Sequence, residues 1–114
     1  MAVSAFSTGT QAAAINTEHV LADVNVAGVF TLHVNLATLA AGDYLELRVK
    51  TVLLTGDTTA KTRIYSFEDA APAENQIFVS EPIGNDLADA TAVRFTLKQI
   101  AGTGRSYKWK VLQY

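Results

Sequence analysis

Residues 93–112 read VRFTLKQIAGTGRSYKWKVL, and this stretch decides the fold class. Apolar and polar side chains alternate on both sides of the central AGTGR segment, which is the period of a strand with one buried and one solvated face. The glycines of AGTGR supply the backbone freedom that a tight turn needs. The stretch therefore predicts an antiparallel hairpin. Its inward row is expected to be Val93, Phe95, Leu97, Tyr107, Trp109 and Val111.

The same alternation recurs upstream, and Gly, Asp, Asn and Pro separate the successive runs. About seven strands and no long helix are typical of an all-β, antiparallel β-sandwich or jelly roll. The expected strands are 13–21, 28–36, 43–54, 61–68, 76–83, 92–100 and 106–114. We expect the inward positions of three of them to be largely buried, namely Leu45, Leu47, Phe95, Leu97, Trp109 and Val111.

The chain is short enough for one domain, which we place at residues 13–114. Residues 1–12 are small and mostly polar, and they offer little apolar surface to a core. We therefore expect a flexible N-terminal arm that the fold does not need. Val3 and Phe6 are isolated apolar residues in this arm. They are expected to fill pockets on a partner while the arm pairs with it as an added strand.

Composition excludes several classes of function. The chain has no cysteine, which rules out disulfides, thiolate metal sites and thiol nucleophiles. Its net charge of −2 argues against a nucleic acid or an anionic membrane as partner. No signal peptide is expected at the start, and no run approaches the roughly 18 apolar residues of a membrane span. Charged residues make up only 18% of the chain, which favours extensive subunit interfaces.

No pattern of catalytic or ligand-binding residues is present. His19 and His33 lack the spacing of a metal site, so we expect no metal and no cofactor. The acidic residues lie mostly in expected loops, where turn formation explains them, and no nucleophile motif frames a serine. We therefore expect no enzyme. The acidic residues considered are Asp57, Glu68, Asp69, Glu74, Glu81, Asp86 and Asp89.

Several aromatic residues raise the alternative of a sugar-binding platform. Tyr65, Phe67 and Trp109, with Arg63, are the residues that would form it. All three aromatics coincide with inward phases of their strands, so packing in the core is the better explanation. A glycan- or receptor-binding module stays open as an alternative.

Three stretches resemble small virion proteins of tailed bacteriophages, of the capsid decoration or cement type: residues 28–49, 77–83 and 95–111. The most distinctive element is a Gly-Thr turn with a following Arg-Ser between two strands. Here it is matched by Gly102, Thr103, Arg105 and Ser106. The resemblance leads us to expect an acidic residue where this chain has Gly104.

The resemblance implies a structural protein that binds and stabilises the phage head. Its partner would be the major capsid protein, and it would form a small homo-oligomer, a dimer or a trimer. It would be assembled in the host cytoplasm and located on the capsid surface of the virion. The expected capsid contacts are Val3 and Phe6. A tail or neck component of the same fold stays open as a further alternative.

Overall fold

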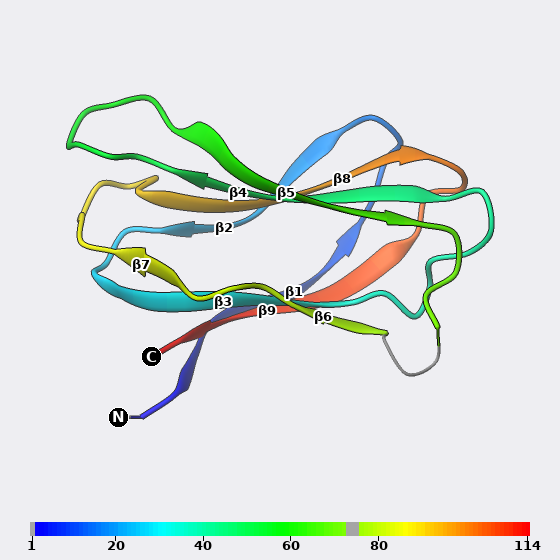
Figure 1. The fold of residues 1–114 in the computed structure, drawn as a ribbon, viewed down its shortest axis with the longest axis horizontal. Helices are drawn as coiled ribbons and strands as arrows, with labels where there is room; N and C mark the ends of the chain where they lie inside the picture. The colour runs from blue at the N-terminus through cyan, green and yellow to red at the C-terminus, as the bar shows by residue number, and fades with distance from the viewer. Residues whose placement is uncertain (1, 73–75) are drawn as a thin grey trace.

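The computed structural model describes residues 2–72 and 76–114, except for the side chains of residues 60–62. The described residues form an all-β fold in which two antiparallel sheets lie face to face as the layers of a β-sandwich (Figure 1). None of them belongs to a helix long and apolar enough to cross a membrane. The prediction of an all-β, antiparallel fold is confirmed.

Sheet A has the order β1-β9-β3-β6 with β7 also paired to β3, and sheet B has the order β2-β8-β4-β5. The described residues thus form nine strands where about seven were expected. One addition is β1, and the other is the division of the expected strand 76–83 into two. The strands are β1 Ser4–Ala12, β2 Glu18–Val24, β3 Gly28–Asn35, β4 Tyr44–Thr51, β5 Ala60–Glu68, β6 Ile77–Val79, β7 Ile83–Asn85, β8 Val93–Ala101 and β9 Ser106–Gln113.

The second half of the chain runs back along the first half. β1 pairs with β9, β2 with β8, β3 with both β6 and β7, and β4 with β5, all antiparallel. Two further pairings, β3 with β9 and β4 with β8, join these pairs into the two sheets. Because successive pairs belong to opposite sheets, the chain crosses between the layers at both ends of the sandwich.

The core lies between the sheets, where the inward rows meet. Five of the six residues expected to be buried are fully so, with exposed fractions of 0%: Leu45, Leu47, Phe95, Leu97 and Val111. Trp109 is an exception, because it is only partly buried. Its cross-strand neighbour on β1 is Gly9, and the ring packs against that glycine's backbone. A Cβ on Gly9 would lie 3.0 Å from Cζ2 of the indole.

The break between β6 and β7 falls at the outer edge of β3. Pro82 follows β6 and has no N–H to donate to a strand ladder. Ser80 maintains the ladder across the break, because its backbone N–H donates to the Leu32 carbonyl at 2.8 Å. Its hydroxyl oxygen accepts the Leu32 N–H, also at 2.8 Å. One strand that is interrupted by a proline therefore stays attached to β3.

The prediction of a separate N-terminal arm is wrong for residues 4–12, which form β1 at one edge of sheet A. This strand pairs with β9 from Ser4 to Ala12. Phe6 is partly buried, and its ring meets Phe30 edge-on with centroids 5.3 Å apart. Val3 precedes the strand and is 53% exposed. An edge strand gains its hydrogen bonds from the backbone, so it needs far fewer apolar side chains than a central strand does.

Deleting residues 2–10 is therefore expected to destabilise the protein. The deletion removes most of the β1 ladder and the Phe6–Phe30 contact, which together contribute about 2 kcal/mol or more. Thermal melts of the deletion variant should show a clearly lowered midpoint, whereas deletion of residues 2 and 3 alone should leave it unchanged. An unchanged midpoint for the longer deletion would restore the view of this segment as an arm.

The loss of unfolding free energy on substitution in the inward rows should increase with the observed burial of the residue. Phe95→Ala should cost about 3–5 kcal/mol of unfolding free energy, because it leaves a cavity in the centre of the core. Trp109→Ala should cost less, because part of the indole is already in solvent. Ile64→Ala, on the outer face of sheet B, is the control and should change stability by about 0.5 kcal/mol or less. Chemical denaturation measures all three, and equal losses at Phe95 and Trp109 would contradict this ranking.

Candidate functional site

The two histidines lie on different sheets and do not form a common site. His19 is on β2, and its Nε2 accepts a hydrogen bond from the Ala14 backbone at 3.1 Å. His33 is on β3, and its Nε2 lies 3.0 Å from the hydroxyl of Thr31. Within residues 2–72 and 76–114, no three His, Asp or Glu side chains are grouped as a metal site requires.

The loop carboxylates are used to shape loops. Asp57 accepts the Leu54 N–H at 3.3 Å, and Asp89 accepts the Gly56 N–H at 3.0 Å. Glu81, in the segment between β6 and β7, pairs with Arg63 on β5 at 2.8 Å. Glu74 lies outside the described residues. The carboxylates of this group for which contacts are described thus serve turns and surface pairing.

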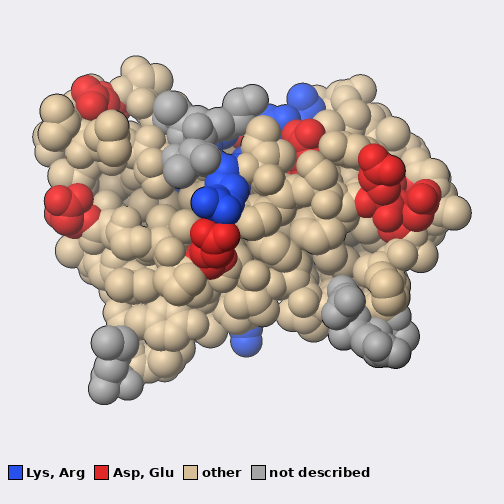
Figure 2. Space-filling model, viewed as in Figure 1, with Lys and Arg blue, Asp and Glu red and all other residues tan. Residues whose placement is uncertain are grey.

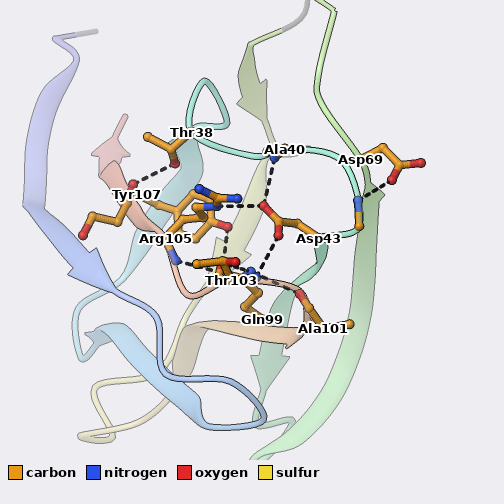
Figure 3. A network of polar contacts seen from close by, with 11 residues as sticks. Thr38, Ala40, Asp43, Asp69, Gln99, Ala101, Thr103, Arg105 and Tyr107 are labelled. Atoms are coloured by element: carbon orange, nitrogen blue, oxygen red, sulfur yellow. Dashed lines mark hydrogen bonds and ion pairs between the residues drawn. The ribbon is translucent and has the colours of Figure 1, made fainter.

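The turn that carries the phage resemblance lies at the centre of a buried polar network (Figure 3). Asp43 is 2% exposed, and its carboxylate accepts the backbone N–H groups of Ala40 and Thr103. It also accepts Nε–H of Arg105 at 2.9 Å. Burial alone would raise the pKa of this carboxyl, but the hydrogen bonds and the Arg105 charge outweigh it and hold the pKa below its ordinary value.

Both glycines of the turn are required by their surroundings. Gly102 has a φ of +92°, and any side chain there would overlap Asp43. A Cβ on Gly104 would lie 2.5 Å from the carbonyl oxygen of Ala13. An acidic side chain at Gly104, as the resemblance led us to expect, therefore does not fit this arrangement. The acid that pairs with Arg105 comes instead from Asp43, on the loop between β3 and β4.

Gln99 extends the network into the core. Its amide nitrogen donates to the carbonyls of Ala101 and Thr103, and its amide oxygen accepts from the Arg105 N–H and the Tyr107 hydroxyl. Burial, with a smaller effect from the Asp43 charge, raises the pKa of Tyr107 to about 12. Each of these groups has a protein partner, so the network fixes the position of the turn against the core.

A second ionic cluster covers the outer face of sheet B. Glu18 on β2 accepts hydrogen bonds from Arg48 at 3.0 Å and from Thr96 at 2.7 Å, and Lys50 lies 2.6 Å away. Burial by itself would raise the pKa of Glu18. The hydrogen bonds from Lys50 and Thr96 and the two positive charges outweigh it and lower the pKa to about 2. The cluster ties β2, β8 and β4 together through side chains.

The aromatic residues proposed for sugar binding lie on the inward side. Tyr65 and Phe67 on β5 pack against Phe78 on β6, with centroid distances of 4.7 and 5.3 Å. These contacts join β5 and β6, which are edge strands of the two sheets and lie on the side nearest the viewer in Figure 1. With Trp109 over Gly9, none of the three rings forms an exposed flat platform.

An open groove of about 640 Å³ crosses the outer face of sheet A. Its walls follow the strand register, because Thr8 lies opposite Lys110 and Thr10 opposite Lys108. His33, across β9 from Thr8, and Ile77 continue the lining toward β6. No acidic side chain is among the described lining residues. The groove is thus a shallow, weakly cationic feature on an otherwise regular sheet surface.

The loop between β4 and β5 presents two leucines to solvent. Leu53 is 84% exposed and Leu54 70%, the two highest values among the exposed large apolar side chains. The expected strand 43–54 ends earlier, at Thr51, so these leucines fall in the loop. The hydrogen bonds to Asp57 and Asp89 described above, with Val52 N–H bonded to the Ala92 carbonyl at 3.0 Å, fix the loop. The sandwich end at its tip shows acidic but no basic groups in the view of Figure 2.

Comparisons with known proteins found no matching family model, curated protein or solved structure. Sequence reasoning missed both the Asp43 network and the exposed leucines. The exposed leucines could have been found from the Val-Leu-Leu run at residues 52–54. Three consecutive apolar residues break the alternation of the preceding strand there.

Stability should fall in acid through the cluster at Glu18. A carboxylate with a lowered pKa stabilises the folded state above its unfolded pKa, and this contribution is lost as pH falls through the folded value. Unfolding free energy should therefore decline as pH drops from about 4.5 toward 2. Denaturation at a series of pH values measures this, and Glu18→Gln should give a shallower decline. Identical profiles for both proteins would show that Glu18 is not linked to folding.

Proposed function

We propose that this chain is a jelly roll. The pairing of β1 with β9, β2 with β8, β3 with β6 and β7, and β4 with β5 is that of a long hairpin folded into two sheets. Counting β6 and β7 as one strand interrupted at Pro82 gives the eight strands of that architecture. Jelly rolls occur in viral capsid and lectin domains. Fold alone does not decide between these two uses.

The function we propose is that of a capsid decoration protein of a tailed bacteriophage, bound to the major capsid protein on the head surface. The observation that carries the proposal is the folded-hairpin strand pairing in a sequence that resembles phage virion proteins. The use of its ionic groups also supports it, because the buried Asp43 and the partly buried Arg105 and Glu18 all hold strands and loops together. A rigid body without an enzymatic activity is what a stabilising shell component requires. It would be assembled in the host cytoplasm together with the head.

We place the principal capsid contact at the β4–β5 loop. Leu53 and Leu54 are held in position before binding, so little chain entropy is lost when they enter an apolar pocket. The acidic residues Asp57 and Asp89 beside them favour a basic rim around that pocket. Leu53 and Leu54 replace Phe6 as the proposed capsid contact, because the Phe6 ring packs on Phe30 within the same chain. Val3 stays a predicted contact. Many copies on a symmetric shell allow each contact to be modest.

The rival function is a glycan- or receptor-binding module. The groove on sheet A is the observation that favours it, since lectins share the fold. The inward direction of Tyr65 and Phe67, and the packing of Trp109 on Gly9, remove the stacking surface that such a module uses. A tail or neck component would keep the fold and the loop but bind a different part of the virion.

Co-sedimentation with phage heads that lack this protein tests the proposal. The wild-type protein should sediment with the heads, and Leu53→Ser/Leu54→Ser should reduce its affinity at least tenfold without changing the melting midpoint. Val20→Ser/Ile64→Ser is the matched control, because its residues are 45% and 43% exposed on the outer face of sheet B, and it should bind normally.

Purified tails and a glycan array complete this experiment. Binding to tails but not to heads would favour the tail or neck role. Binding to a sugar without binding to heads would refute the decoration role and support the rival module.

A further inference from the structure

Each sheet ends in two edge strands, and β1 differs from the other edges. It is the end strand of sheet A on the side of β9, and no described strand pairs with its other edge. From Ser7 to Ala12 it runs in unbroken register with β9. The sequence of this run is STGTQA, which contains no charge and no proline. It is therefore a regular row of outward backbone N–H and C=O groups with neutral side chains, all of them small except Gln11.

The other three edges carry features that discourage pairing with another chain. β2 has a register shift between Val20 and Ala22 and bears the charges of Glu18 and Asp23. β5 has a register shift near its start and carries Arg63 and Glu68. The remaining edge, β6 with β7, is interrupted between Val79 and Ile83 by a segment that includes Glu81 and Pro82. β1 has a register shift only near its start, between Ala5 and Ser7.

We propose that the β1 edge binds the β1 edge of a second copy of this chain, antiparallel and about a twofold axis. Sheet A would then continue from one subunit into the other with β1 beside β1 of the partner subunit. This inference goes beyond the proposed function and does not depend on it, because it follows from the edges alone. It assigns a surface to the dimer, one of the two oligomeric states expected from the sequence.

Two physical reasons favour a second copy over an unrelated segment. An antiparallel strand pair is symmetric, so a regular edge is complementary to itself, and twofold dimers are the commonest assemblies of identical chains. Because the run from Ser7 to Ala12 is neutral, self-pairing places no like charges opposite each other. The nearest lysines, Lys108 and Lys110, are on β9 and stay one strand away from the new interface.

The size of the pairing is sufficient for a specific but reversible contact. Six residues in regular register allow about six new backbone hydrogen bonds, and net contributions of about 1 kcal/mol each are typical. Side chains on both faces of β1 add contact area, with Thr8 and Thr10 on the outer face and Ser7 and Gln11 on the inner face. All four are uncharged, and Ser7, Thr8 and Thr10 are also small, so the two backbones can approach to strand spacing.

Sedimentation velocity of the purified protein over a range of concentrations tests the proposal. The wild-type chain should form dimers, and Thr8→Lys/Thr10→Lys should weaken dimerisation at least tenfold, because it places lysines on both edges at their contact. Ala37→Lys/Ala41→Lys adds the same charge on the exposed β3–β4 loop and should stay dimeric. Circular dichroism melts verify that each variant is folded.

A charge-swap experiment then identifies the surface directly. Thr8→Glu/Thr10→Glu mixed with the lysine variant should give dimers with one chain of each kind, resolved by native mass spectrometry. Hydrogen exchange should show protection of amides in residues 7–12 that is lost in the lysine variant. A monomeric or trimeric wild type, a lysine variant that dimerises normally, or a mixture without mixed dimers would each overturn the proposal. None of these outcomes would alter the expected binding to phage heads.

Discussion

The fold depends on the buried carboxylate of Asp43 and on the chain segments that its network joins. Asp43 lies where the chain crosses from sheet A to sheet B, and the turn that it binds through Thr103 and Arg105 crosses back from β8 to β9. Asp69 in the β5–β6 connection bonds to Gly42 and to the Asp43 carbonyl. The β1–β2 connection donates from Ala13 and Asn16 to Arg105 and Gln99. All four crossings at this end are thus linked, which fixes the two layers relative to each other (Figure 3).

The alternation of apolar and polar residues was sufficient to predict the strands and most of the core. Leu47, Phe95 and Val111 lie where the pattern placed them, because a strand with one wet face leaves little choice of register. β1 was missed because its side chains are small and polar, and an edge strand is stabilised mainly by its backbone. Trp109 lies on the predicted inward side, but it is only partly buried, whereas we expected it to be largely buried. The alternation pattern gives no information about Gly9, the cross-strand neighbour on which its ring packs.

The polar interactions between distant segments could not be predicted from one sequence. Asp43 and Arg105 are 62 residues apart, and local patterns give no indication that they meet. The glycines of the AGTGR turn were visible as turn formers, but the reason that Gly102 admits no side chain is its contact with Asp43. The two ends of the sandwich also differ in a way that sequence alone did not show. One end is closed by the Asp43 network, and the other presents Leu53 and Leu54 on a fixed loop.

This division suits a protein that binds with one end and one edge while the rest stays rigid. If the chain decorates a phage head, as we propose, a cryo-electron-microscopy reconstruction of the virion will locate it there. We expect a sandwich-shaped density on the outer surface of the capsid, with the β4–β5 loop against the major capsid protein. Density at the tail or neck, or no density for this chain on the head, would contradict it.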